Sequence, residues 1–177
     1  MLTSEKLQKI KTEKFDDIFF NSLNFSVGMY CTEKNRKQYT IPDYQRDYVW
    51  TTKQASQYIE SIILGFPLNP ILGLQTRYDR YEIIDGSQRL RTLWHFVNDD
   101  FALHGCNILS DLNFMRFNDF DAELKVLFEI STLPFLYIRN NEGKNVNRSI
   151  ILDLFNRINI CTPMKKGDFD KASKILD

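Results

Sequence analysis

Hydrophobic residues along this chain follow two patterns, helical spacing and short apolar runs, which together predict a domain that mixes helices with a small sheet. Apolar residues three or four positions apart predict helices between 51 and 65, from 87 to 97, over 119–130 and over 146–159. Apolar runs bounded by turn residues predict strands over 70–75, 81–85 and 133–140. The polar turn over 77–80 joins the first two strands as a hairpin.

The remaining segments carry weaker patterns. Residues 1–23 are typical of a polar lead-in or a short amphipathic helix, and 23–31 have partial strand character. We expect a charged turn over 33–38 and a loop with a short strand over 99–112. A last short helix is predicted to begin near Asp168.

The charge balance, the cysteines and the N-terminus limit the classes of function that the sequence favours. The 177 residues include 23 basic and 23 acidic side chains, so overall charge gives nucleic-acid binding no support, although a local basic patch remains compatible with it. The three cysteines lie far apart without metal-like spacing and are interpreted as reduced thiols. The charged N-terminus lacks the apolar core of a signal peptide, and no apolar run is long enough to span a membrane. These features predict a soluble cytoplasmic protein without a membrane partner.

The stretch 81–96 contains the most informative pattern, because a predicted strand ends at Asp85-Gly86 and a predicted helix follows directly. Gly86 allows a sharp turn and a close approach of a ligand to the backbone. The first amides of the helix, at Ser87, Gln88 and Arg89, are then free to bind phosphate. Arginine is slightly unfavourable at this positive end of a helix, and a bound anion would offset that cost.

Two side chains of this motif carry candidate chemistry. Arg89 can hold a phosphate through its forked guanidinium, and Asp85 can bind a divalent metal or accept a proton. The same residues are also compatible with a routine turn in which Asp85 or Ser87 caps the helix. The short motif alone favours that structural interpretation.

Two further polar clusters accompany the motif. Tyr44, Gln45 and Arg46 begin an aromatic stretch, where Arg46 can contact phosphate and the aromatic rings can stack on a base. The alternative is that this stretch is core and that Arg46 pairs with an acid at the surface. Arg157 and Asn159 lie near the C-terminal end of the helix over 146–159, where the helix dipole alone favours arginine.

Four stretches occur in a characteristic order: IPDYQRDYVW, SIILGFPLNPILG, IIDGSQRLRTL and LFNRINICTPMKKGDF. Together they resemble the N-terminal domain family of GmrSD-type modification-dependent restriction enzymes, a ParB-like nuclease domain of the ParB/sulfiredoxin-like superfamily. The resemblance covers 39–169. The family signature Asp-Gly-Gln-Gln-Arg stands here as 85–89, with Ser87 in place of the first glutamine.

This resemblance implies an α/β (α+β) fold, with a small mixed sheet, flanking helices and a helical C-terminal part. It places a lead-in with an edge strand at 1–38 and the ParB-like domain at 39–177. It also implies a phage-defence or restriction function, in which the domain binds a nucleoside triphosphate and hydrolyses it with Mg²⁺. The implied partners are DNA and a nuclease domain or subunit supplied in trans.

The resemblance also distributes roles among the residues. Asp85, Arg89 and Arg46 are the candidate catalytic residues, with Asp85 positioning magnesium or the attacking water. The candidate nucleotide-binding residues are Gly86, Ser87, Gln88, Arg89, Gln45, Tyr44, Arg157 and Asn159. Two alternatives stay open: a DNA-binding or DNA-nicking protein, and a catalytically silent interaction module.

Overall fold

The computed structural model describes residues 3–15, 18–140 and 148–158. The chain divides into two compact units, Met1–Val146 and Asn147–Asp177. The second unit contributes helix α7 (Arg148–Ile158). The sequence-based division at residue 38 stays a prediction.

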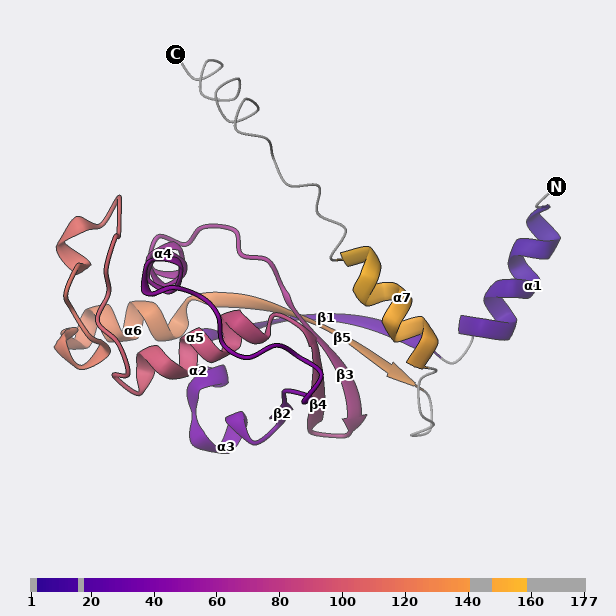
Figure 1. The fold of residues 1–177 in the computed structure, drawn as a ribbon. Coiled ribbons are helices and arrows are strands. Elements are labelled where there is room, and N and C mark those ends of the chain that lie inside the picture. Colours follow the sequence, from indigo (N-terminus) through magenta and orange to yellow (C-terminus); the bar gives the residue numbers. More distant parts are fainter. Residues whose placement is uncertain (1–2, 16–17, 141–147, 159–177) are drawn as a thin grey trace, which may run out of the picture. The chain divides into compact units, whose positions relative to one another are not determined.

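A five-stranded mixed sheet forms the centre of the first unit (Figure 1). Its strands are β1 (Ile18–Ser26), β2 (Tyr39–Thr40), β3 (Ile71–Arg77), β4 (Arg80–Asp85) and β5 (Thr132–Asn140). Their order across the sheet is β1-β5-β3-β4-β2. The β1–β5 and β3–β4 pairs are antiparallel, whereas the β3–β5 and β2–β4 pairs are parallel.

Helices accompany this sheet. They are α1 (Ser4–Phe15), α2 (Val27–Cys31), α3 (Glu33–Arg36), α4 (Thr52–Ile63), α5 (Ser87–Val97) and α6 (Ala122–Ile130). Helices α2 and α4 each pack against both α5 and α6, and α5 contacts β3. Figure 1 shows these four helices gathered together beside the sheet. Thr51 begins α4 with a reciprocal capping box to Gln54, as the threonines at this point predict.

Most of the predicted elements are confirmed, and with them the mixed α/β class. The helices expected between 51 and 65, from 87, over 119–130 and over 146–159 correspond to α4, α5, α6 and α7. The predicted hairpin is β3–β4, and the predicted strand over 133–140 is β5. The helix expected near Asp168 lies outside the described residues.

Three local predictions were wrong. The strand character expected over 23–31 holds as far as Ser26, the end of β1, and residues 27–31 form helix α2. In this helix the buried Tyr30 donates its hydroxyl to the Leu133 carbonyl oxygen at 3.0 Å. The charged segment after Thr32 forms the short helix α3, whose N-terminus the Thr32 side chain caps. The segment 99–112 contains a 3₁₀ turn (Ser110–Leu112) and no strand.

Aromatic rings fill much of the core. One group surrounds Phe135 of β5 and contains Phe25, Tyr30, Tyr39, Tyr81 and Tyr137. A second group surrounds Phe96 of α5 and contains Phe101, Phe117, Phe120 and Phe128. Edge-to-face is the commonest geometry in the first group, and in the second group three of the four pairs that Phe96 makes have it, as the quadrupoles of the rings favour. The second group fixes α5 against the 3₁₀ turn Phe117–Asp119 and helix α6.

A buried carboxylate organises the loop that follows α5. Glu60 of α4 is only 5% exposed, and its side chain accepts three backbone hydrogen bonds from this loop. The donors are the amides of Asn107 at 3.2 Å and of Ile108 and Leu109 at 2.7 Å each. A single charged side chain therefore satisfies three consecutive amides.

The thiols within the described residues are free and shielded. Burial raises the pKa of Cys106 to about 11 and that of Cys31 to about 12. The neutral thiol is therefore the stable form of both groups at physiological pH. Cys161 lies outside the described residues.

We expect Cys106 to react with iodoacetamide at pH 8 roughly two hundred times more slowly than an ordinary thiol, because about 0.1% of it is thiolate at that pH. Its rate should rise about tenfold per pH unit up to the raised pKa. Mass spectrometry of the Cys106 peptide measures this rate, with the unfolded protein in denaturant as the control. Equal rates in the folded and unfolded states would contradict the shielding.

Candidate phosphate-binding site

The junction between β4 and α5 needs a glycine. Gly86 has a φ of +93° and occupies the N-cap position of α5 without any side-chain cap. A Cβ atom at this position would lie 3.0 Å from Nη2 of Arg89 and 3.1 Å from Cγ1 of Ile71. No side chain caps α5, so the first amides of the helix have no side-chain acceptor, and the first two residues of the helix, Ser87 and Gln88, are only 5% and 6% exposed. Phosphate binding by these amides stays a prediction.

Arg89 is held at this junction by an intramolecular ion pair. Its Nη2 donates to Oδ2 of Asp85 at 2.9 Å and to the carbonyl oxygen of Pro70 at 2.9 Å. The Arg89 side chain is 15% exposed and that of Asp85 28% exposed. Nε of Arg89 is buried and has no hydrogen-bond partner among the described residues. The guanidinium therefore has a fixed position and an unused donor.

Two glutamines fasten the segment around Arg46 to the same junction. The buried Gln88 accepts from the Val49 amide and donates to the Asp47 carbonyl oxygen, both at 2.9 Å. Gln45 donates to the carbonyl oxygens of Ile83 at 3.0 Å and Ile84 at 2.7 Å. These bonds hold the backbone on both sides of Arg46, so the first two polar clusters of the sequence meet here.

The side chains of this segment differ in what they contact. Arg46 is exposed and makes no hydrogen bond or ion pair with other described residues. The exposed Tyr44 donates its hydroxyl to Glu82 at 2.9 Å, while Tyr48 shares a 2.8 Å hydrogen bond with Thr92. Tyr48 thus belongs to the packing of α5, whereas Arg46 is available to a ligand.

A buried tyrosine beside Arg89 was not predicted. Tyr58 of α4 is 8% exposed, and its hydroxyl has no partner among the described residues. Burial raises the pKa of Tyr58, and the charge of Arg89 partly opposes that rise. Tyr58 falls on the apolar stripe of its helix, so its spacing predicts only a position in the hydrophobic core. The site therefore contains two unused buried donors, one on Arg89 and one on Tyr58.

The third sequence cluster belongs to the second unit. Arg157 lies on α7 and donates to Asp153 at 2.8 Å, one helical turn earlier. Asn159 lies outside the described residues. The suggested nucleotide-binding roles of Arg157 and Asn159 stay predictions.

Mg²⁺ binding at this site would depend mainly on the ligand. Nowhere in the described segments do three or more His, Cys, Asp or Glu side chains gather in a way that could hold a metal ion. Mg²⁺ commonly uses one or two carboxylates together with substrate phosphates. Asp85, at the end of β4, fits that requirement as a single carboxylate ligand.

Fold and site together define a mixed α/β domain with an uncapped helix N-terminus, a glycine turn and a fixed arginine at one junction. The chain belongs to the family described as "GmrSD restriction endonuclease, N-terminal domain", which it matches over residues 29–162. The family resemblance of the sequence is therefore confirmed. The match includes the whole β4–α5 junction and the Arg46 segment.

Individual proteins of known sequence or structure show at most a low similarity to this chain. None of the curated proteins matches the chain. A similar solved structure is the C-terminally truncated chromosome-partitioning protein ParB from Caulobacter crescentus complexed with CTP-gamma-S. The identity is 13% and the TM-score 0.41, over 82% of this chain and 56% of that chain. The chain thus spans little more than half of that structure's length.

Among the helices that the structure describes, none has the length and apolar character needed to cross a membrane.

Proposed function

We propose that the β4–α5 junction binds the phosphates of a nucleoside triphosphate, and that the domain hydrolyses this ligand with Mg²⁺ as part of a restriction system. The observation that carries the proposal is the uncapped start of α5 at Gly86, with the fixed guanidinium of Arg89 beside it. Backbone amides and a forked cation are the groups that bind phosphate most effectively. A nuclease domain or subunit, and DNA, are the partners that this function requires.

The proposed function assigns a role to each residue near the junction. The amides of Ser87, Gln88 and Arg89 bind phosphate oxygens, and Arg46 adds a second positive charge from the fastened segment. Gln88 and Gln45 act mainly by holding that segment. Bound Mg²⁺ would neutralise phosphate charge. The Asp85 carboxylate is then the group that holds the metal or orients the attacking water.

The ion pair between Asp85 and Arg89 gives this proposal a specific form. In the structure each group neutralises the other at 2.9 Å. A triphosphate with its metal offers both groups a new partner, because phosphate attracts Arg89 and the metal attracts Asp85. The pair would then open in the bound state and close again after product release.

We expect Arg89→Ala to weaken triphosphate binding at least tenfold and to abolish hydrolysis, because the fixed guanidinium is lost. Asp85→Asn should lower the hydrolysis rate about a hundredfold or more, yet leave metal-free nucleotide binding intact or stronger, because it releases Arg89. Calorimetry with each of the four ribonucleoside triphosphates, with and without Mg²⁺, measures binding, and phosphate release measures turnover.

The control is Arg77→Ala, which removes an exposed arginine at the opposite end of β3 and should leave both quantities unchanged. Binding without turnover would make the domain a nucleotide sensor. If the folded wild type binds none of the four nucleotides, the proposal is wrong, and DNA or a protein partner is left as the ligand.

A further inference from the structure

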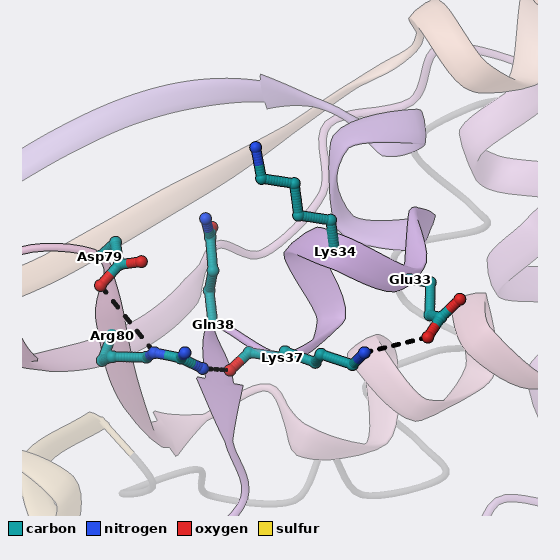
Figure 2. A pocket seen from close by; sticks show the side chains of 6 residues that line it. All are labelled: Glu33, Lys34, Lys37, Gln38, Asp79 and Arg80. Carbon is teal, nitrogen blue, oxygen red and sulfur yellow. Dashed lines mark hydrogen bonds and ion pairs between the residues drawn. The ribbon is translucent and has the colours of Figure 1, made fainter.

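A second charged region lies at the tip of the β3–β4 hairpin, beside α3, at the end of β3 remote from Gly86. Here the structure contains a cavity of about 410 Å³. Figure 2 shows the side chains that line it: Glu33, Lys34, Lys37, Gln38, Asp79 and Arg80. Lys34 and Gln38 extend in the same general direction from α3 and the segment after it. Nothing in the proposed nucleotide site uses this region.

Positive charge is in excess around this cavity. Lys34, Lys37 and Arg80 line it together with two carboxylates, and Arg77 stands at the end of β3 directly before the turn. Neither Lys34 nor Arg77 has a side-chain hydrogen bond or ion pair with any residue that the structure describes. Because the whole chain is formally neutral, this excess is a local property of the hairpin tip.

The carboxylates here are weakly held partners. Lys37 pairs with Glu33 at 3.0 Å, and Arg80 pairs with Asp79 at 3.9 Å. The four side chains are 48% to 87% exposed, so each pair gains little from its attraction. A phosphate ligand could therefore replace either carboxylate at low cost. Lys34 and Arg77 can contact a polyanion without losing any side-chain hydrogen bond or ion pair to the described residues.

The backbone around these cations is held in place. Arg80 donates through Nη1 to the carbonyl oxygen of Lys37, and the Tyr81 amide donates to that of Gln38 at 2.8 Å. Strand β2 then continues this contact by pairing in parallel with β4. Helix α3 and the hairpin thus form one preformed surface, which lowers the conformational cost of binding.

Tyr78 occupies the tip of the hairpin and is 95% exposed. Arg77 pairs with Arg80 across the strands, so the turn contains only Tyr78 and Asp79. Gln75 donates to the Tyr78 carbonyl oxygen at 2.7 Å and fixes the turn. A narrow two-stranded ribbon of this kind fits the major groove of duplex DNA. Tyrosine, arginine and lysine side chains also donate many of the hydrogen bonds that proteins make to DNA phosphates and sugars.

We propose that the hairpin surface, defined as Lys34, Lys37, Arg77, Tyr78 and Arg80, binds duplex DNA. In this arrangement the turn with Tyr78 enters the major groove, and the four cations contact phosphates on either side of it. This contact is separate from the nucleotide site, and it rests on the proposed function in that it assigns a surface to the DNA partner named there. It depends on phosphate neutralisation, so its strength must fall steeply with salt.

Fluorescence anisotropy with a labelled duplex of about 20 base pairs, at about 50 mM and about 200 mM salt, tests the proposal. We expect the double substitution Lys34→Ala/Arg77→Ala to weaken duplex binding about tenfold at the lower salt and to reduce the salt slope by about two. Tyr78→Ala should weaken binding several-fold, whereas Tyr78→Phe retains the ring and should weaken it less. All these side chains are exposed, so each variant is expected to fold.

The matched control is Lys6→Ala/Lys11→Ala on α1, which removes the same charge from another exposed surface and should leave duplex binding close to that of the wild type. Equal losses in the two double variants would overturn the proposal, because only general charge would then matter. Absence of duplex binding by the wild type at the lower salt would also overturn it. Tighter binding of the labelled single strand than of the duplex would overturn the major-groove assignment.

Discussion

Replacing Glu60 by alanine is expected to lower the free energy of unfolding by about 3–4 kcal/mol. The substitution removes the carboxylate that accepts from the amides of Asn107, Ile108 and Leu109, and leaves these three donors without that acceptor. An unsatisfied buried donor costs about 1–3 kcal/mol, and the total is smaller here because Asn107 and Ile108 are exposed and water can reach the loop. The cavity left by the side chain adds to the loss.

Chemical denaturation of the wild type and of Glu60→Ala measures this effect. Glu60→Gln should fall between them, because its amide oxygen still accepts hydrogen bonds but no longer carries a charge. Glu13→Ala, on the exposed surface of α1, serves as the control and should change stability by less than about 0.5 kcal/mol. A loss of similar size in Glu13→Ala and Glu60→Ala would contradict the role assigned to the buried carboxylate.

We expect Gly86→Ala to destabilise the protein by about 2–4 kcal/mol and also to displace Arg89. Two costs combine here: an L-residue at a φ of +93° is strained, and the added Cβ meets neighbours at 3.0–3.2 Å. One of those neighbours is the Cα atom of Ile71, which cannot move without the strand. The remaining triphosphate affinity should therefore fall together with stability.

Gly65→Ala separates the two costs. Gly65 has a φ of +69°, but a Cβ atom there would have no neighbour within 4 Å. Its replacement should therefore cost only the backbone strain, about 1 kcal/mol, and should leave triphosphate binding unchanged. Thermal or chemical denaturation measures both variants. Equal losses at the two glycines would show that crowding at Gly86 is unimportant.

The sequence alone predicts the parts of this fold in which local pattern and tertiary packing agree. Helix α4 begins at a threonine cap and ends before Gly65, and its apolar stripe is the buried face. The turn at Asp85-Gly86 likewise predicts the strand-to-helix junction that the structure contains. In these places, residues close in sequence determine the conformation, so one sequence is sufficient.

Contacts between segments that are distant in the sequence could not be predicted from local patterns. Residues 27–31 have strand-like composition, yet they form helix α2, in which Tyr30 contacts Leu133 about a hundred residues away. Gln88 was identified as a phosphate ligand, and its side chain binds the backbone of the Arg46 segment about forty residues away. Tyr58 was hidden in an apolar stripe because helical spacing does not reveal which neighbour a hydroxyl meets.

The sheet order also determines when this domain can fold. Strand β5 is the last strand in the sequence, but it lies between β1 and β3 and pairs with both. The β1–β5 pairing therefore joins segments on the order of a hundred residues apart, and such distant pairing slows folding. During synthesis, the β3–β4 hairpin can form early, whereas β1 must wait for the strand that begins at Thr132. Until β5 leaves the ribosome, β1 has no partner in the sheet, and this interval is when the nascent chain is most exposed to aggregation.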